Sequence, residues 1–443
     1  MLHIYLREMR NLMSAGALAL AGSVMSLAPA QAVEVQRVVS PAGIEAWLVE
    51  DDTVPIVAMN FSFEGGATQD PAGKEGVTRL LAATLDEGAG DLDSEAFQAR
   101  LEDLSVSIGF DTGKDYFYGN LRTLTPTIDE AFELLRMAVK EPRFDPEAVE
   151  RMKSQIAVGI RRDERDPDSI ASRNLMKTML GDHPYALRTT GSEESLMSLA
   201  PEDLRSQHAH IFALERLRIG VVGAIDAATL APLLDKVFAG LPKETSLRPV
   251  PELTAEDSLE IEETLPLPQT KLVFGLPALT RTDPDYQAAF VMNHILGGGS
   301  FTSWLYEEVR EKRGLTYSVG TSLAPYNAGG LLLGSAATRA DRADETLAVI
   351  LEQFNRMAED GPTQAELDSA KRFLTGSYPL RFDSSGKIAR QLVALQNVGL
   401  GIDYFERRNA EIDAVTLEDV KRVAHRLLAG KTPTVSMVGP KSN

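Results

Sequence analysis

The chain has 443 residues and no cysteine, and its 64 acidic and 45 basic side chains give a formal net charge of -19 at pH 7. The missing cysteine excludes disulfides, thiolate metal sites and cysteine nucleophiles. The negative charge argues against nucleic acid or an anionic membrane surface as the main partner. Peptides, other proteins and small molecules remain as possible partners.

Residues 1–32 have the three-part pattern of a secretory signal peptide. Arg7 and Arg10 precede an apolar run over residues 12–27, and the segment ends in Ala30-Gln31-Ala32, a small-x-small cleavage site. The run is short for a membrane span, although an uncleaved N-terminal anchor is the alternative. We expect cleavage after Ala32, a periplasmic location, and no membrane insertion once the signal is removed.

After residue 32, strands and helices come in separate runs rather than in strict alternation. Alternating spacing of apolar residues predicts strands, and helical spacing predicts helices. In chain order, the first part of the sequence gives a strand at 56–63, helices at 76–85, 97–104, 148–160 and from 201, and a strand at 218–223. The later part gives a strand at 315–319, helices at 347–354 and from 417, and a strand at 434–438. This order favours an α+β protein with antiparallel-rich sheets packed with helices.

A proline-rich stretch divides this pattern into two halves. Five prolines fall between residues 241 and 268 among many acidic residues, a density that breaks both helices and sheet ladders. We therefore predict an N-terminal domain over residues 33–243, a linker over 244–266 and a C-terminal domain over 267–443.

The two halves are related by an internal repeat. Asp203 and Asp419 stand 216 residues apart in helix-like stretches, and Val222 and Val438 stand the same distance apart in strand-like ones. A constant offset over separate matches indicates a duplication. We therefore predict that the chain consists of two homologous domains.

One stretch of the second half resembles a known family. Residues 310–317 read Arg-Glu-Lys-Arg-Gly-Leu-Thr-Tyr and follow a Leu-Gly-Gly-Gly-Ser run at 296–300. This stretch resembles the second domain of the pitrilysin/insulinase family of zinc peptidases, which includes the mitochondrial-processing-peptidase-like proteins. In the family it presents an arginine and a tyrosine to the bound peptide, and the matching residues here are Arg310 and Tyr317. The resemblance implies the two-domain metallohydrolase fold of that family.

The local pattern around these two residues also allows a purely structural interpretation. Arg310 falls in the last turn of a predicted helix that begins near Ser303, where a cation stabilises the carbonyl end. Tyr317 alternates with Leu315 and Val319 and could belong to the core.

In the first half, the chain departs from the family at the zinc site. The family's active members carry H-x-x-E-H on a helix, and the matching positions here hold Arg79, Ala82 and Ala83. The third ligand position, a downstream glutamate in the family, corresponds to Gly159. Zinc needs imidazole or carboxylate donors at about 2 Å, so we expect no metal and no catalytic residue in this chain.

A substrate-binding strand is implied by the same resemblance. Phe110, Asp111 and Thr112 begin a strand-like run to Leu121 that matches the strand at which the family's substrates add by backbone pairing.

The resemblance implies a non-catalytic subunit of a two-subunit periplasmic zinc metallopeptidase. This chain, without a cofactor of its own, would contribute Arg310 and Tyr317 to the active site of a zinc-bearing paralogous partner, around a peptide substrate. The alternative is a structural or peptide-binding component of a periplasmic complex with no role in hydrolysis. A third hypothesis, a peptidase active alone, lacks all its metal donors.

Overall fold

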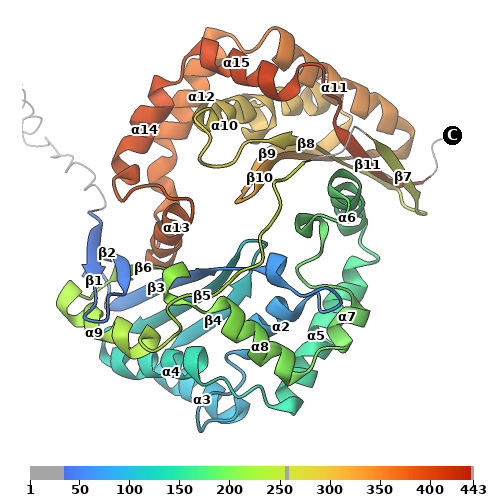
Figure 1. Ribbon diagram of the computed structural model, residues 1–443. Coiled ribbons are helices and arrows are strands. Elements are labelled where there is room, and N and C mark those ends of the chain that lie inside the picture. Colours follow the sequence, from blue (N-terminus) through green and yellow to red (C-terminus); the bar gives the residue numbers. More distant parts are fainter. Residues whose placement is uncertain (1–33, 255–258, 441–443) are drawn as a thin grey trace, which may run out of the picture. The chain divides into compact units, whose positions relative to one another are not determined.

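The computed structural model in Figure 1 describes residues 34–254 and 259–440. From Val35 onward these residues form one compact unit. The predicted signal peptide and its cleavage site lie outside the described residues. No helix within 34–254 or 259–440 is long and apolar enough to cross a membrane.

The first half builds a six-stranded sheet in the order β1-β2-β6-β3-β5-β4, in which only β2 and β6 pair in parallel. Its strands are β1 Gln36–Val39, β2 Glu45–Glu50, β3 Ile56–Glu64, β4 Ser107–Thr112, β5 Tyr116–Leu124 and β6 Leu217–Gly223. The helices of this half are α2 Val77–Thr84, α3 Ser94–Leu104, α4 Ile128–Lys140, α5 Pro146–Asp163, α6 Pro167–Leu180, α7 Glu193–Met197, α8 Pro201–Ile211 and α9 Ala227–Phe238.

The second half builds a five-stranded sheet in the order β7-β11-β8-β10-β9, in which only β7 and β11 pair in parallel. Its strands are β7 Glu260–Thr264, β8 Gln269–Ala278, β9 Thr316–Tyr326, β10 Gly329–Arg339 and β11 Thr434–Gly439. The helices are α10 Tyr286–Asn293, α11 Ala343–Glu359, α12 Gln364–Gly376, α13 Ser385–Asn397, α14 Tyr404–Ala414 and α15 Leu417–Leu428.

These two sheets confirm the predicted α+β class, and their matching strand orders agree with the predicted duplication. The order β6-β3-β5-β4 in the first sheet corresponds to β11-β8-β10-β9 in the second. The predicted helices that begin at Pro201 and Leu417 are both present, as α8 and α15. At both helices an aspartate three residues after the N-cap accepts a hydrogen bond from the N-cap amide, at 2.9 and 3.0 Å, which fixes the helix start.

Strand β7 lies inside segment 244–266, which the prolines predicted as a linker. It is an edge strand with the sequence Glu-Ile-Glu-Glu-Thr, and none of its residues is fully buried. Its apolar pattern is therefore too weak to identify it, and its hydrogen bonds come from β11, far along the chain. The remaining described part of the segment, 244–254, 259 and 265–266, contains no helix or strand.

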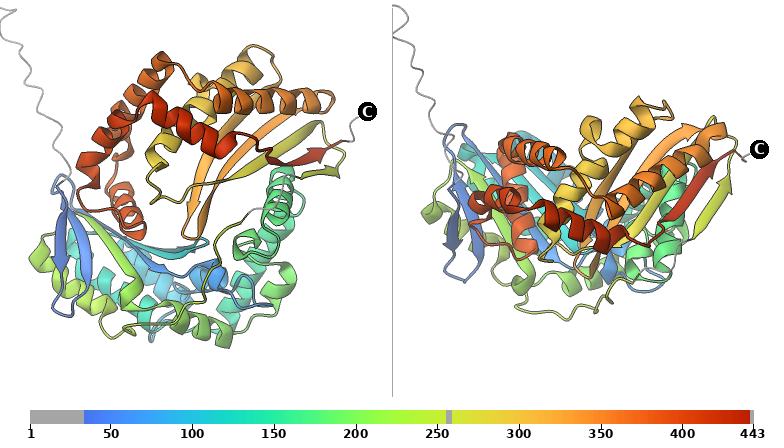
Figure 2. Two further views of the ribbon diagram at one scale, coloured as in Figure 1. Left: turned by 45° about the horizontal axis from the view of Figure 1, so that its top comes forward. Right: turned by 90° about the horizontal axis from the view of Figure 1, so that it is seen from above.

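Each sheet receives a helix from the other half of the chain (Figure 1, Figure 2). Helix α6 packs on β11 and β8, and α13 packs on β6 and β3. At Gly220 in β6, a Cβ atom would lie 2.5 Å from the carbonyl oxygen of Ala389 and 2.7 Å from Leu392 Cβ, both in α13. Only glycine permits this close approach. The two sequence repeats are therefore packed into one unit by exchanged helices.

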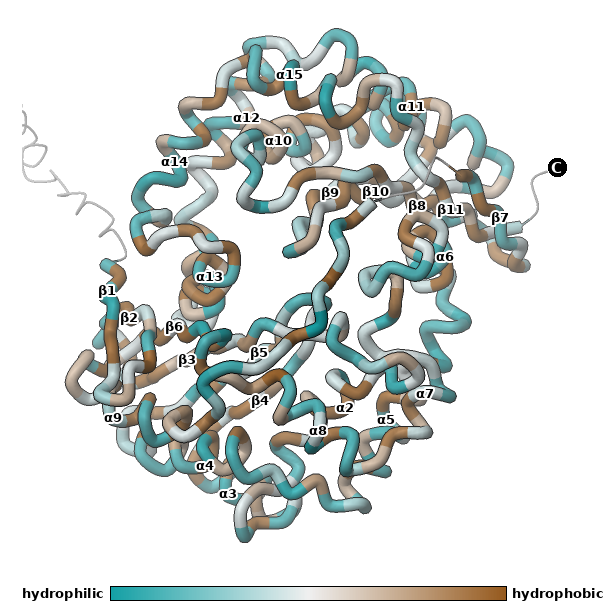
Figure 3. The backbone as a smooth tube through the Cα atoms, in the orientation of Figure 1, coloured by the Kyte–Doolittle hydropathy of each residue, from teal (hydrophilic) through white to brown (hydrophobic). Residues whose placement is uncertain are grey.

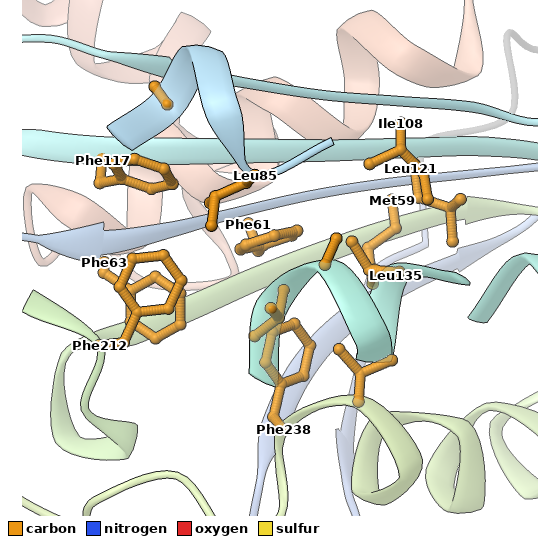
Figure 4. Close-up of a cluster of buried hydrophobic side chains, with 14 of the residues drawn as sticks. Met59, Phe61, Phe63, Leu85, Ile108, Phe117, Leu121, Leu135, Phe212 and Phe238 are labelled. Carbon is orange, nitrogen blue, oxygen red and sulfur yellow. The ribbon is translucent and has the colours of Figure 1, made fainter. Parts of the chain in front are cut away.

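The core of the first half lies between its sheet and the helices that cover one face, with Phe61 at its centre (Figure 4). The Phe61 ring centroid is 6.0 Å from that of Phe63 and 5.2 Å from that of Phe238. In Figure 3, hydrophobic residues follow β3, whereas the outer helices alternate hydrophobic and hydrophilic residues, as expected for helices with one buried face.

Candidate functional site

Three of the four degenerate zinc positions, Arg79, Ala82 and Ala83, lie on α2, which is short and closely surrounded. Its predicted apolar residues are confirmed as core, since Val77, Leu80, Leu81 and Leu85 are at most 1% exposed. Ala82 is also buried, at 2% exposed, whereas Ala83 and Arg79 are half-buried. Ala82 therefore lies on the packed side of the helix. Helices α5 and α8 and strand β4 all pack against α2, so little of its surface remains open.

Arg79 forms an ion pair with Asp111 of β4. The Nη1 group of Arg79 donates to Oδ1 of Asp111, which joins the first motif position to the predicted substrate strand. The two side chains are 36% and 69% exposed, so the pair contributes at most about 1 kcal/mol to stability. A guanidinium therefore stands at the position where the family resemblance places a zinc ligand.

Gly159 lies on α5, and apart from its own stretch of helix no atom lies within 4 Å of the position that a Cβ would take. A side chain would fit there, but glycine supplies no donor. Within 34–254 and 259–440, no three His, Asp or Glu side chains are grouped so that they could hold a metal ion. The residues at the family's zinc positions do not fit the metal.

His208 and His210 do not form a ligand pair. The Nε2 atom of His208 lies 2.8 Å from the carbonyl oxygen of Val139, and Nε2 of His210 lies 3.3 Å from Oε1 of Gln69. Burial lowers the pKa of both rings. The two imidazoles serve separate packing contacts.

We predict that the purified mature chain retains no stoichiometric zinc, because Arg79, Ala82, Ala83 and Gly159 offer no donor atoms. The measurement is elemental analysis after zinc addition and dialysis, beside a zinc-bearing peptidase of the family treated identically. One zinc per chain that survives dialysis would contradict the prediction.

The second candidate site lies on β9, the last strand of the second sheet. Tyr317 is 82% exposed, although Leu315 and Val319 on either side are 5% and 7% exposed. The pairing of β9 with β10 shifts here, so that Tyr317 and Ser318 together stand opposite Ala337. This is a β-bulge, which redirects a side chain. The interpretation of Tyr317 as a core residue is therefore wrong.

Thr316 supports the bulge. Its hydroxyl donates to the carbonyl oxygen of Ala337 at 2.6 Å and accepts from the amide of Ser318 at 3.1 Å. These bonds satisfy backbone groups that an extra residue would otherwise leave unpaired. The hydrogen bonds of Thr316 thus stabilise the bulge that holds Tyr317 away from the core.

Arg310 lies on a segment that packs against β9. This segment is the π-helix η7, Tyr306–Glu311, and η7 contacts β9. Arg310 Nη1 donates to the hydroxyl of Tyr306, and its Cζ lies 4.7 Å from the Tyr306 ring centroid. The side chain is 34% exposed. Sequence reasoning missed Tyr306 as the residue that holds Arg310, because an i, i+4 pair on a helix is also ordinary surface packing.

A second π-helix precedes this segment. It is η5, His294–Gly298, and it also packs against β9. At Gly297 a Cβ would lie 2.4 Å from Oγ1 of Thr321, so the glycine run is needed for close packing on β9. π-helical turns are frequent at functional sites; here η7 carries Arg310, and both η5 and η7 pack against the strand of Tyr317.

The predicted substrate strand is shorter than its sequence pattern. The run from Phe110 to Leu121 is a hairpin, because the backbone turns at 113–115 between β4 and β5. Phe110 packs against the core, Thr112 is 8% exposed, and Asp111 points to the surface, where it pairs with Arg79. Strand β4 is the last strand in the sheet order, so within the described residues no strand pairs with its outer edge.

Two family models together match most of the described chain. Residues 46–193 match the insulinase family, peptidase family M16, and residues 198–374 match the peptidase M16 inactive domain. A Helicobacter pylori protein named non-peptidase homolog YmxG is 26% identical over 372 residues, with 84% of this chain and 86% of that protein covered. A Bacillus subtilis protein named uncharacterized zinc protease YmxG is 25% identical, with 92% and 99% covered.

Solved structures similar to this chain support the same family assignment. A peptidase M16 inactive domain from Pseudomonas fluorescens has a TM-score of 0.87 and 31% identity, with 92% of this chain and 98% of that chain covered. A Helicobacter pylori protease has the same fold, with a TM-score of 0.83, 16% identity, and 92% and 99% covered. The resemblance predicted from residues 296–317 is thus confirmed, and the chain belongs to the insulinase family of peptidases, family M16.

Proposed function

We propose that this chain is the non-catalytic subunit of a two-subunit periplasmic zinc metallopeptidase. A zinc-bearing paralogue with an intact H-x-x-E-H motif would supply the metal, and this chain would supply Arg310 and Tyr317. The observation that carries the proposal is the bulge in β9, which holds Tyr317 at 82% exposure. What sets Tyr317 apart from other exposed side chains is the bulge, which turns it out of a strand whose neighbouring residues Leu315 and Val319 face the core.

The chemistry of the two side chains suits this role. A tyrosine hydroxyl can donate a hydrogen bond to the oxyanion that develops when a peptide carbonyl is attacked. The guanidinium of Arg310, held by Tyr306, can donate to carbonyl groups of the peptide backbone. Neither role needs a metal in this chain.

The donor-free positions on α2 and α5 support the non-catalytic part of the proposal. Arg79, Ala82, Ala83 and Gly159 could not hold zinc, so hydrolysis by this family's chemistry requires another chain. The alternative is a structural or peptide-binding component with no role in hydrolysis. That alternative accounts for the lost donors equally well, but it does not require the Tyr317 hydroxyl to act on a reacting carbonyl.

Purification of the tagged chain from the periplasm of its native host tests the pairing. We expect one zinc-bearing paralogue to co-elute at a 1:1 ratio, with one zinc per pair. A chain that elutes alone, or with proteins that carry no H-x-x-E-H motif, would contradict the proposal.

The location has its own test. We predict that the mature protein begins Val33-Glu34-Val35, because Ala30-Gln31-Ala32 is a signal-peptidase pattern. N-terminal sequencing of protein from the periplasmic fraction gives the answer directly. Recovery of the uncleaved chain in the membrane fraction would favour the anchor instead.

A further inference from the structure

A pocket in the second half of the chain is lined by cationic and aromatic side chains. It has a volume of about 250 Å³ and lies among α10, α13, α14 and the short helix η9, Tyr378–Arg381. Its walls include three arginines and three tyrosines and no acidic residue: Arg281, Arg381, Arg408, Tyr286, Tyr378 and Tyr404. In a chain with a net charge of -19, this is a local concentration of positive charge.

Arg408 is a buried cation without an acidic partner. It is 5% exposed, and its Cζ lies 3.9 Å from the ring centroid of Tyr378. Both of its hydrogen bonds use Nη1, which donates to the carbonyl oxygen of Leu374 at 3.2 Å and to Oδ1 of Asn409 at 2.9 Å. A guanidinium has five N–H donors, and buried charges are normally paired. Burial and the nearby charges of Arg381 and Arg281 lower the pKa of Arg408.

The other two arginines are also free of ion pairs in the described part of the chain. Cζ of Arg281 lies 4.3 Å from the ring centroid of Tyr286, and its Nη2 donates to the hydroxyl of Tyr404 at 2.5 Å. Arg381 is exposed to solvent. Within 34–254 and 259–440, none of the three lies within 4.0 Å of a carboxylate oxygen.

Acidic residues near the pocket are already engaged. Glu411 accepts from Gln287, a residue of the pocket wall, at 2.8 Å, but its charge is paired with Arg407. Asp403 also pairs with Arg407, at 3.2 Å. These carboxylates therefore leave the three arginines of the pocket uncompensated.

One wall residue also carries an unused donor. The Tyr378 hydroxyl is buried and has no hydrogen-bond partner among the described residues. An unsatisfied buried polar group is costly, at about 1–3 kcal/mol in proteins. Because the hydroxyl is itself covered from solvent, the contribution of Tyr378 to the pocket wall is its ring.

We propose that this pocket binds a small planar organic anion, of which an aromatic carboxylate is the simplest type. Arginine donors match the planar geometry of a carboxylate, and the tyrosine rings offer flat apolar walls to the ring of the ligand. Benzoate, one ring with one carboxylate, is the simplest ligand of this type and fits within the pocket. The site is separate from Arg310 and Tyr317 and does not depend on the proposed peptidase role.

Calorimetric titration of the mature chain with benzoate, benzamide and inorganic phosphate tests this assignment. We expect saturable binding of one benzoate per chain, with neutral benzamide and phosphate each at least about tenfold weaker, because only benzoate offers both the charge and the ring. Arg381→Gln should weaken benzoate binding about tenfold, and Arg281→Gln should do the same. Arg381 is exposed, so its replacement leaves the fold intact.

Arg372→Gln is the matched control. It removes one positive charge from the exposed surface of α12, away from the pocket wall, and should leave benzoate affinity unchanged. The assignment is wrong if benzoate shows no saturable binding, if benzamide or phosphate binds as tightly, or if both pocket variants retain wild-type affinity.

Discussion

Replacing Tyr317 by phenylalanine is expected to lower kcat/KM of the reconstituted two-subunit peptidase by about 10²–10³, which corresponds to about 2.7–4 kcal/mol for one lost oxyanion donor. The substitution removes one hydroxyl and keeps the ring. Because Tyr317 is 82% exposed, neither the fold nor the bulge needs this hydroxyl. The measurement is steady-state hydrolysis of a peptide by the pair, with the variant and the wild type compared at equal subunit ratios.

Thermal melts of this subunit alone provide the control, and the melting temperature of Tyr317→Phe should equal that of the wild type. Arg310→Lys is the companion variant, since it keeps the positive charge but loses the planar guanidinium held against Tyr306. It should also impair turnover. Wild-type turnover with both variants would reject the composite site and leave the structural or peptide-binding alternative.

Phe61→Ala should destabilise the chain by about 3–5 kcal/mol, the range for a fully buried phenylalanine. Phe61 is 0% exposed, and its ring lies directly over Gly119 of β5, where a Cβ would meet the ring at 2.1 Å. The neighbouring strand is held by backbone hydrogen bonds to β3 and β4. The surroundings therefore cannot collapse fully into the space that the ring leaves.

Urea unfolding of the variant and the wild type measures this change through the transition midpoint and its slope. Val158→Ala on α5, at a site 61% exposed, is the matched control and should shift stability by no more than about 0.5 kcal/mol. A loss below about 1 kcal/mol for Phe61→Ala would mean that Phe61 is not central to the core.

The fold was predictable where the local sequence carries its own signal. Helices α8 and α15 begin at acidic capping patterns, and β3 shows the apolar residues of a buried strand. The duplication was visible as an offset of 216 residues between Asp203 and Asp419. Strand β7 was not predictable, since its sequence is largely charged and its partner β11 lies at the other end of the second half.

The candidate site was predictable only in part. The lack of zinc donors at the family's metal positions follows from the identities of Arg79, Ala82, Ala83 and Gly159 alone. The exposure of Tyr317 cannot be predicted from the sequence, because a bulge breaks the two-residue period on which strand patterns depend. The anion pocket was missed for a different reason. Arg281, Arg381 and Arg408 span more than a hundred residues and meet only through packing of α10, η9 and α14.

Titration of the zinc-bearing paralogue with this chain tests the central claim most directly. Peptide hydrolysis by the paralogue alone should be low, should rise as the chain is added, and should reach a plateau at one chain per paralogue. A peptidase rate that is the same with and without the chain would contradict the account, because it would show that Arg310 and Tyr317 complete no active site.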